Sequence, residues 1–491
     1  MKEFNKFEYK KTLTKEVFTM SKKLTKYEKK IEHTVKSKKK AIEEMKKTTT
    51  KKPTSINVKD GADFYSHKHI INYLTETDLY KFTQQQFYVH KRSNDRAKWE
   101  FKIRSKGVNL APLCKRINEE LDWMCTLKFQ QFELDWFKKQ NYFTHDYVEF
   151  LEDFQLKRRH IKCYTDAKNT TLFIEAEGSQ KNVSPWEIYV LHIVQALWMN
   201  GEEIDWDKAK ANLDKEIEKV NAATRAGIKF TVSDFSVRRT ISSEWEDYMV
   251  GRMLAMCPAF VGTSNVYLAI KHNCTAIGTF AHELDATYQG LSNVTIEMAQ
   301  KQKLTDWADE YDGKLGIALS DNYGFKAFLN DFGLKFAKLF DGCRHDSGDP
   351  IRWGEMLIAH YKKLGIDPTN KVACWSDSLD IDKALSIAKH FNGRIRIAFG
   401  IGTYLGATVC ETKREPLSMV MKVVEVNGKP VVKLSESATK CMCHDENYIN
   451  YVKMKYNYKS IDEMTVEEIL EMLPDFKDVK LSDIYHPKKA T

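Results

Sequence analysis

The fold is decided by seven short apolar runs in residues 228–405, which end in SDF (233–235), GTSN (262–265), GTFAHE (278–283), LSDN (319–322), CRHDSGD (343–349), CWSDS (374–378) and AFGIGT (398–403). Most of these polar endings lead into a segment that has the apolar spacing of a helix. The repeated order of strand, polar tip and helix predicts an α/β barrel. The tips of such strands meet at one rim, where they can surround one small molecule.

The polar tips carry side chains that suit one kind of chemistry. They include His282, several aspartates and arginines, and turns of Gly, Ser and Thr that suit a phosphate. Transfer of a phosphoribosyl group needs a cradle for a 5′-phosphate, carboxylates for ribose hydroxyls and a metal-bound pyrophosphate, and a group that orients the incoming base. The pattern therefore predicts an enzyme that acts on a phosphorylated sugar.

The composition is that of a large globular protein. The chain has 491 residues, 42% of them hydrophobic, which is enough for roughly two or three domains. Its ten cysteines are scattered, which favours reduced thiols over disulfides or a zinc site and indicates a cytoplasmic location. The longest apolar run, residues 188–199, is too short to cross a bilayer, so we expect no contact with a membrane interior.

Residues 1–60 differ in composition from the rest of the chain. They hold 19 Lys and 8 acidic residues, a local charge of +11 within a chain total of +9. Such charge density predicts a solvated extension without a fixed fold. Aromatic and basic residues that interleave as base stacking requires occur only at 4–11, so contact with nucleic acid is the weaker alternative.

Apolar spacing and helix-capping residues predict the secondary structure. Helices are expected at 119–139, 185–199, 208–224, 242–256, 323–340, 351–363 and 381–391. Strands are expected at 98–106 and 171–178, with a hairpin in 418–435. Asp349-Pro350 is typical of a helix start, either Asp205 or Asp207 is expected to cap the helix at 208–224, and Asn427-Gly428 predicts the hairpin turn.

A series of motifs runs through most of the chain. They are TETDLYKFTQQQ (75–86), DFSVRR (234–239), GTSNVYLA (262–269), GTFAHE (278–283), RHDSGDP (344–350), SDSLD (376–380), FGIGTYL (399–405), and KVVEVNGKPVVKLSES (422–437) with a trailing CHD (443–445). In this order and spacing they resemble the nicotinate phosphoribosyltransferases. The resemblance covers roughly residues 73–450 and leaves the Lys-rich extension outside. One motif alone is a weak signal, whereas the ordered set is specific.

The resemblance implies a fold of three parts after the extension at 1–60. An α/β domain (61–225) precedes an irregular TIM-like α/β barrel (226–410), and a carboxyl-terminal segment (411–491) packs on the first domain to build an α/β sandwich. It also implies a homodimer whose active sites are shared between subunits. The implied reaction converts nicotinate and 5-phosphoribosyl 1-pyrophosphate to nicotinate mononucleotide and pyrophosphate in NAD salvage, with Mg²⁺ and coupled ATP hydrolysis.

His282 is the expected catalytic residue. The resemblance implies that ATP phosphorylates it, giving a phosphohistidine, and that Asp321 is its carboxylate partner. A neutral imidazole nitrogen is nucleophilic, and a carboxylate on the other nitrogen fixes the tautomer. A single His is more often structural, but its place among aspartates and Gly-rich turns favours catalysis. Glu283, next to it on a strand, is expected to point to the opposite face.

The resemblance also implies how the base binds. The pyridine ring stacks between Phe235 and Tyr80 of the partner subunit, which contributes about 1 kcal/mol on each face, and Arg238 pairs with the ring carboxylate. Taken alone, Phe235 could pack in the core and Tyr80 could lie on a helix surface. Ser264 stands where nicotinamide-using relatives have Asp. A carboxylate about 4 Å from the nicotinate carboxylate would cost about 4 kcal/mol at an effective dielectric of roughly 20, so Ser264 favours the acid.

Residues before the predicted helix start at Pro350 are expected to bind the sugar donor, because exposed amides at a helix start attract anions. They are Arg344, Asp346, Ser347 and Gly348. By the resemblance, Arg344 holds the base or the donor, while Asp346 and Asp377 meet the ribose hydroxyls and Mg²⁺.

A second group is expected at the 5′-phosphate. Gly400, Gly402 and Thr403 follow a strand, and their small side chains let backbone amides approach an anion. Gly402 alone could instead be a tight turn.

Three residues depart from the family pattern. Ser236 and Val237 stand where the family has Gly and a variable residue, so a special backbone angle there would change the local turn. Tyr404 stands where a relative can carry Arg, which would remove one phosphate contact.

Two other functions stay open at this point. A nicotinamide phosphoribosyltransferase is disfavoured by Ser264. A catalytically silent scaffold that binds partners through residues 1–60 is disfavoured by the polar tips, which such a protein would not need.

Overall fold

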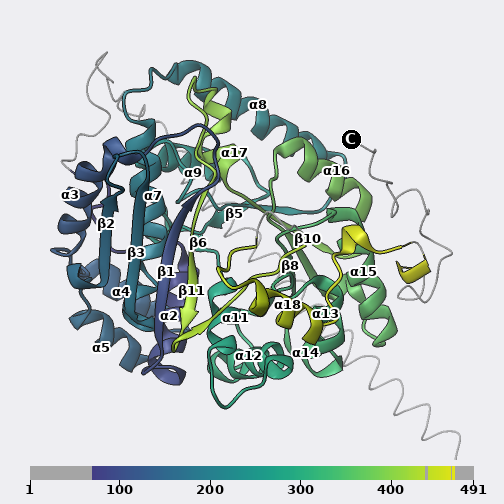
Figure 1. Cartoon of the computed structure of the whole chain (residues 1–491). Coiled ribbons are helices and arrows are strands. Elements are labelled where there is room, and N and C mark those ends of the chain that lie inside the picture. Colours follow the sequence, from purple (N-terminus) through teal and green to yellow (C-terminus); the bar gives the residue numbers. More distant parts are fainter. Residues whose placement is uncertain (1–68, 437–440, 466, 470–491) are drawn as a thin grey trace, which may run out of the picture. The chain divides into compact units, whose positions relative to one another are not determined.

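Two β-sheets organise the part of the chain that the structure describes (Figure 1). This computed structural model describes residues 69–436, 441–465 and 467–469. The predictions for residues 1–60 lie outside this part. No helix among the described residues is long and apolar enough to span a bilayer. All ten cysteines are free thiols.

The first sheet joins strands from both ends of the described chain. Its order is β12-β11-β1-β3-β2, and its neighbouring strands are antiparallel. The strands are β1 (Arg96–Ile103), β2 (Ile161–Thr165), β3 (Leu172–Ser179), β11 (Met419–Val426) and β12 (Lys429–Pro430). The predicted strands at 98–106 and 171–178 and the hairpin are therefore confirmed. Asn427 and Gly428 have φ angles of 51° and 76°, as a type I′ turn requires.

Helices from the first half of the chain pack on this sheet. They are α2 (Leu79–Lys91), α3 (Cys114–Met124), α4 (Gln131–Lys139), α5 (His145–Asp153), α6 (Gln180–Val183) and α7 (Trp186–Met199), with the short 3-10 helices η1 (Ala111–Leu113) and η2 (Arg158–His160). The long helix predicted at 119–139 is wrong, because α3 and α4 are separate. The Glu133 carboxylate accepts from the backbone of Gln130 at 2.7 Å and of Thr75 at 2.9 Å, and this capping box starts a new helix.

The second sheet is the predicted barrel, in an open form. Its seven strands are parallel and follow the order β6-β5-β4-β10-β9-β8-β7 among the described residues. They are β4 (Thr231–Asp234), β5 (Phe260–Thr263), β6 (Thr275–Ala276), β7 (Ile317–Leu319), β8 (Gly342–His345), β9 (Val372–Trp375) and β10 (Arg396–Ile401). The first and last strands, β4 and β10, pair with each other, so the curled sheet has its two edges at β6 and β7.

Helices alternate with these strands and cover the outside of the sheet (Figure 1). They are α8 (Trp206–Arg225), α9 (Ser243–Met256), α10 (Val266–Lys271), α11 (His282–Gln289), α12 (Ile296–Tyr311), α13 (Phe325–Asp331), α14 (Leu334–Leu339), α15 (Pro350–Lys363), α16 (Ile381–Phe391) and α17 (Thr403–Gly406), with η3 (Pro368–Asn370) and η4 (Thr408–Cys410). The predicted caps are present, since Asp205 accepts from the backbone of Lys208 and Asp349 from that of Arg352. The predicted helix at 323–340 is two helices. The first, α13, ends at Asp331, and Gly333 is the N-cap of the second, α14.

The carboxyl-terminal segment contacts both sheets. Strand β11 pairs with β1 along its whole length (Figure 1). The residues after Pro430 lie against the barrel instead: Leu434 N donates to Asn322 O at 2.8 Å, and Tyr456 stacks on Tyr323 at 4.0 Å between ring centroids. This part includes α18 (Glu446–Lys455) and η6 (Ile461–Glu463). The structure thus adds barrel contacts that the domain prediction did not include.

Candidate active site

A cleft of about 320 Å³ opens where strands β4, β8, β9 and β10 end, and strand β11 of the first sheet forms its other wall. Of the predicted residues, the cleft is lined by Phe235, Arg238, Arg344, Asp346, Asp377, Gly402 and Thr403. The carboxyl ends of parallel strands therefore meet at one rim, as the barrel pattern predicts.

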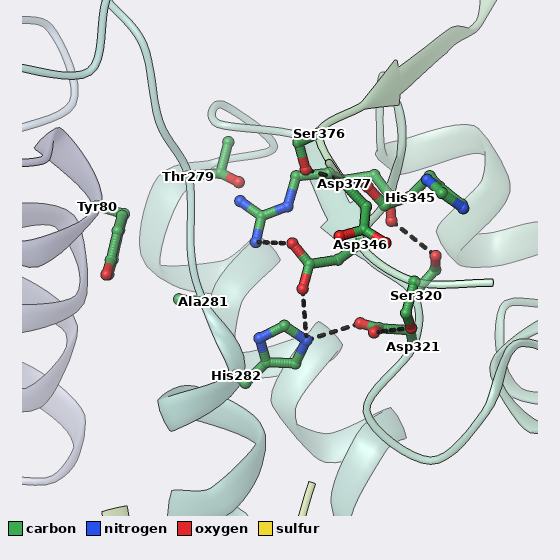
Figure 2. A network of polar contacts seen from close by, with 12 residues as sticks. Tyr80, Thr279, Ala281, His282, Ser320, Asp321, His345, Asp346, Ser376 and Asp377 are labelled. Atoms are coloured by element: carbon green, nitrogen blue, oxygen red, sulfur yellow. Dashed lines mark hydrogen bonds and ion pairs between the residues drawn. The ribbon is translucent and has the colours of Figure 1, made fainter. Parts of the chain in front are cut away.

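His282 lies beside this cleft, and Asp321 holds its ring (Figure 2). Its Nε2 atom is 2.7 Å from Asp321 Oδ1 and 3.7 Å from Asp346 Oδ2. The residue is 6% exposed. Burial, together with the positive charge of Lys433, lowers the pKa of His282 to about 4, although Asp321 acts in the other direction. The ring is therefore neutral near pH 7: Nε2–H donates to Asp321, and Nδ1 carries the free lone pair.

The position of His282 in the chain differs from the prediction. Strand β6 ends at Ala276, and His282 is the first residue of helix α11. Glu283 consequently does not point to the opposite face of a strand. It is buried, and its carboxylate accepts from Lys81 Nζ at 2.5 Å and from Ser184 Oγ at 2.7 Å. The reason is that β6 pairs with β5 through only two residues, after which the chain is free to turn into a helix.

Lys433 is a central residue of the site that the sequence did not single out. Its Nζ atom is 3.1 Å from Asp321 Oδ2 and 3.0 Å from Asp346 Oδ2. Burial alone would raise the pKa of Asp321, but Lys433 and His282 hold it well below its ordinary value. The alternation of VVKLS (431–435) predicts a strand with Lys433 on its polar face. Nothing in that alternation indicates which residues the lysine meets.

Asp346 lies among cations. Besides its contact with Lys433, its Oδ1 atom is 3.9 Å from Arg344 Nη2. Burial works against ionisation, yet Lys433, His282 and Arg344 keep the pKa of Asp346 far below the ordinary range. The carboxylate is therefore charged at every physiological pH.

The residues that could hold a metal ion are only partly those predicted. Among the described residues, one set of three potential ligands has its ligand atoms within 4.8 Å of one another, and it consists of His282, Asp321 and Asp346. Asp377 lies outside this set but lines the same cleft as Asp346. Two carboxylates that face one cleft are a donor set that Mg²⁺ accepts, so Asp346 and Asp377 fit the predicted ion, with Lys433 as a competitor for Asp346.

Ser347 and Gly348 do not line the cleft. Ser347 is 1% exposed and donates from Oγ to Asp321 Oδ2 at 2.5 Å, so it supports the carboxylate that holds His282. Gly348 has a φ of +86° and accepts from His345 Nε2 at 3.0 Å. It shapes the turn before α15, where a residue with a side chain would be strained.

Phe235 and Gly402 line the cleft, and Gly400 lies against the Phe235 ring. A Cβ atom on Gly400 would lie 2.2 Å from the Phe235 ring, and one on Gly402 would lie 2.8 Å from the Phe235 carbonyl oxygen. Gly400 is itself buried and does not line the cleft. The lack of a side chain at Gly400 therefore makes room for the Phe235 ring. The predicted role was different, namely to let a backbone amide approach the 5′-phosphate.

Arg238 shares the buried carboxylate of Glu187 with two lysines. The sequence did not indicate a role for this glutamate or for either lysine. Arg238 Nη1 is 3.9 Å and Lys422 Nζ is 3.7 Å from Glu187 Oε1, and Lys81 Nζ is 2.6 Å from Glu187 Oε2. Burial opposes ionisation of Glu187, but these three cations lower its pKa to about 2. Glu187, on helix α7, thus balances the positive charges of Arg238 and Lys422, which line the cleft.

Tyr80 and Ser264 are both more buried than expected. Tyr80 is 7% exposed, packs with Ile188 and Val237 of its own chain, and donates from its hydroxyl to Glu187 Oε2 at 3.2 Å. The structure therefore holds this ring inside its own chain. Ser264 is 4% exposed and does not line the cleft. Burial raises the pKa of the neighbouring Asp78 carboxyl, against the effects of Arg238 and of the Ser264 hydroxyl.

The departures from the family pattern cause no backbone strain. Neither Ser236 nor Val237 adopts a positive φ angle. The Ser236 side chain has room because Gly406 has no side chain. A Cβ atom on Gly406 would lie 2.5 Å from the Cβ atom of Ser236. Tyr404 lines the cleft next to Glu216, and burial raises its pKa to about 12.

Sequence comparisons match the chain to one family. Residues 230–460 match the model described as the nicotinate phosphoribosyltransferase (NAPRTase) family, and residues 75–195 match the model of its N-terminal domain. The nicotinate phosphoribosyltransferase of Chromobacterium violaceum is 40% identical over 401 residues, which cover 80% of this chain and 98% of the relative. That of Acinetobacter baumannii is 40% identical over 404 residues, which cover 80% of this chain and 99% of the relative.

Solved structures give the same answer. The crystal structure of nicotinate phosphoribosyltransferase from Vibrio cholerae has a TM-score of 0.75 and 31% identity, and covers 82% of this chain and 97% of its own. The enzyme from Porphyromonas gingivalis has a TM-score of 0.74 and 30% identity, and covers 79% of this chain and 100% of its own.

Proposed function

The chain belongs to the nicotinate phosphoribosyltransferase family, and we propose that it transfers the phosphoribosyl group of 5-phosphoribosyl 1-pyrophosphate to nicotinate. The pyridine nitrogen gives its lone pair to C1 of the sugar, and the C1–O bond breaks as pyrophosphate leaves with the bonding electrons. The products are nicotinate mononucleotide and pyrophosphate. One observation carries the proposal: a single cleft brings together Phe235, Arg238, Asp346 and Asp377. The His282–Asp321 pair lies beside it, with His282 Nε2 3.7 Å from Asp346 Oδ2.

The charge of the cleft suits anionic substrates. Six cationic side chains line it, namely Arg104, Arg238, Arg239, Arg344, Lys422 and Lys433. Three carboxylates oppose them, namely Glu187, Asp346 and Asp377. A cleft with excess positive charge attracts a phosphate, a pyrophosphate and a ring carboxylate, and raises their local concentration.

The base is placed at the Phe235 end. Stacking of the pyridine ring on Phe235 contributes about 1 kcal/mol. Arg238 faces the same space, and its 3.9 Å separation from Glu187 is longer than a hydrogen bond, so its N–H groups can donate to the nicotinate carboxylate. A neutral carboxamide would gain less from this cation, which favours the acid over nicotinamide.

The sugar donor is proposed to lie between Phe235 and the His282–Asp321 pair. Gly402 and Thr403 line the cleft where the 5′-phosphate is expected, while Asp346 and Asp377 face the ribose hydroxyls. Mg²⁺ would be held by the same two carboxylates, and when bound it neutralises charge on the pyrophosphate. Lys433 and Arg344 add fixed positive charge beside the leaving group.

His282 is proposed to couple ATP hydrolysis to this transfer. The lone pair of Nδ1 attacks the γ-phosphorus of ATP, an N–P bond forms, and the P–O bond to ADP breaks. Asp321 keeps the proton on Nε2 and stabilises the positive charge that develops on the ring. Water later cleaves the N–P bond and releases phosphate. The 2.7 Å contact between His282 and Asp321 and the neutral state of the ring support this step.

A homodimer with shared sites is also part of the proposal. The predicted stacking partner is Tyr80 of the partner subunit, yet Tyr80 is 7% exposed within one chain and binds Glu187 there. Tyr80 does not line the cleft of its own chain either, so its burial favours neither chain as the source of the stacking ring.

The reaction is tested by incubating the purified protein with sugar donor, Mg²⁺, ATP and labelled nicotinate or labelled nicotinamide. Nicotinate mononucleotide is expected as the main product. Preferential use of nicotinamide would overturn the proposed substrate. Absence of both products, in protein whose melting temperature shows that it is folded, would favour the silent scaffold instead.

Lys422 is expected to make donor binding depend on pH. Burial, with repulsion from Lys433 and Arg238, lowers its pKa to about 8, while Glu187 acts against the fall. The ammonium group attracts the anionic donor below pH 8 and loses its charge above it. The KM for the donor should therefore rise between pH 8 and 9, by up to about tenfold per unit.

Lys422→Arg is the matched control for this pH dependence, because a guanidinium stays charged throughout this range. Steady-state kinetics across the range should show a flatter KM in that variant. An equal rise in both proteins would mean that another group causes it.

Gly400→Ala is expected to displace the Phe235 ring, because the added Cβ atom would lie 2.2 Å from it. Overpacking of this kind destabilises a protein by about 1–3 kcal/mol, and loss of the stacking surface should raise the KM for nicotinate. Gly333→Ala is the control, since nothing beyond its chain neighbours lies within 4 Å of its added Cβ. Nicotinate kinetics and thermal melts measure both effects. An unchanged KM in Gly400→Ala would remove Phe235 from the base site.

A further inference from the structure

The residues before His282 leave the barrel sheet. Strand β6 pairs with β5 only through Thr275 and Ala276, and the described sheet ends at β6 and β7 without joining them. Residues 277–281 have no helix or strand of their own. The sheet supplies two hydrogen bonds to this half-buried segment, because Ile277 N donates to Thr263 O and Thr279 Oγ1 donates to Ile317 O, both at 2.9 Å. The backbone groups closest to His282 need partners elsewhere.

Helix α2, from the first part of the chain, holds this turn. Gly278 lies so close to it that an added Cβ atom would be 3.1 Å from Tyr80 N. Thr83 Oγ1 donates to Thr279 O at 2.6 Å, and Gln84 Oε1 accepts from Ala281 N at 2.7 Å. The helix thus takes the place of a neighbouring strand along the segment before His282.

Gln84 also binds the residue that follows His282. Its Nε2 atom donates to Glu283 Oε1, and Lys81, one turn earlier on α2, binds the other carboxylate oxygen of Glu283 at 2.5 Å. Gln84 is completely buried. One amide group therefore brackets His282, with its oxygen on Ala281 and its nitrogen on Glu283.

The two neighbouring glutamines are equally buried but have other partners. Gln85 Nε2 donates to Lys181 O at 2.8 Å, and its Oε1 accepts from Tyr147 Oη at 2.8 Å. Gln86 binds Tyr142 O at 3.0 Å and the backbone of Thr144 at 2.9 Å. The run QQQ at 84–86 thus contains one glutamine aimed at the histidine turn and two that serve packing elsewhere.

We propose that Gln84 is a positioning residue for His282: its two hydrogen bonds set the start of helix α11, and so the direction of the imidazole toward Asp321. Gln84 does not line the cleft. The use of His282 as a phosphoryl acceptor rests on the proposed function, whereas the positioning does not. Misplacement of a reacting group by about 1 Å can cost roughly a hundredfold in rate.

The test compares Gln84→Met with Gln85→Met, which removes an equally buried glutamine from the same helix. The first readout is the far-downfield proton resonance of His282 Nε2–H donated to Asp321, assigned by its absence in His282→Ala. The second is the amount of acid-labile phosphoprotein formed from radiolabelled ATP. Thermal melts should show similar losses of stability in the two variants, because each removes the two side-chain hydrogen bonds of one buried glutamine.

Gln84→Met is expected to lose the resonance and to form at least about tenfold less phosphoprotein, while Gln85→Met keeps both. Retention of the resonance in Gln84→Met would overturn the proposal, and so would an equal loss in both variants. If the wild-type protein forms no phosphoprotein, the ATP step of the proposed function fails, but the resonance still decides the positioning role.

A charge-preserving exchange covers the case in which Gln84→Met does not fold. The double variant Gln84→Glu/Glu283→Gln reverses donor and acceptor between the two side chains and keeps one carboxylate near Lys81. The new carboxylate can still accept from Ala281 N. We expect the double variant to regain the resonance that each single change weakens. Its absence in a folded double variant would overturn the proposal.

Discussion

The His282→Ala variant is expected to form no phosphoprotein from ATP, and its production of nicotinate mononucleotide should no longer respond to ATP. The methyl group offers no nucleophile in place of Nδ1. The fold should survive, because Asp321 keeps Lys433 at 3.1 Å and the hydrogen bond from Ser347 at 2.5 Å. Radiolabel transfer and steady-state rates with and without ATP measure the two effects.

His192→Ala is the matched control for this variant. His192 is 1% exposed, and burial lowers its pKa to about 4, as for His282, but it lies on α7 outside the cleft and contacts Ser243 at 3.4 Å. It should lose stability and keep phosphorylation. Wild-type labelling in His282→Ala would place the phosphoryl acceptor elsewhere and end the coupling proposal.

Ser264→Asp is expected to weaken nicotinate use by about a thousandfold. Ser264 does not line the cleft, so this magnitude rests on the base position that the family resemblance implies. A carboxylate about 4 Å from the nicotinate carboxylate, at an effective dielectric of roughly 20, costs about 4 kcal/mol. The structure adds a second penalty, since the new charge would be buried beside the Asp78 carboxyl, whose pKa burial already raises. Arg238 is the nearby cation that would be drawn toward the new charge and away from the ligand. The measurement is kcat/KM for nicotinate and for nicotinamide.

Ser264→Asn separates the charge from the size of the side chain. Asn has the shape of Asp without its charge, so it should keep most nicotinate activity. A similar loss in both variants would show that the small, 4% exposed site rejects any larger side chain, and the electrostatic account of acid selectivity would then be wrong.

The sequence predicted those features that depend on neighbours in the chain. The order of strand, polar tip and helix identified the barrel. Asp349 and Pro350 start α15, and Asn427-Gly428 forms the hairpin turn. Each depends on backbone preferences and hydrogen bonds within a few residues, which a local pattern records.

Two long helices were predicted, at 119–139 and 323–340, where the structure has pairs of shorter ones. Apolar spacing alone does not show where such a helix is interrupted. Apolar spacing continues through the break before α4, but Glu133 binds Thr75, which is distant in sequence. His282 was expected on a strand for a similar reason, since only the sheet shows that β6 stops after two paired residues. Apolar periodicity records which face is buried, and not where hydrogen bonding ends.

The sequence by itself determined the barrel, its polar tips and the residue types that a phosphoribosyl transfer needs. Only the tertiary structure decided that Lys433 joins Asp321 and Asp346, that Glu187 fixes Arg238 and Lys422, and that Gln84 brackets His282. These contacts join residues that lie far apart in the sequence. Coulomb and hydrogen-bond energies depend on distances of a few ångströms between atoms, and packing of the whole chain sets those distances, whereas the local sequence sets only backbone and side-chain preferences.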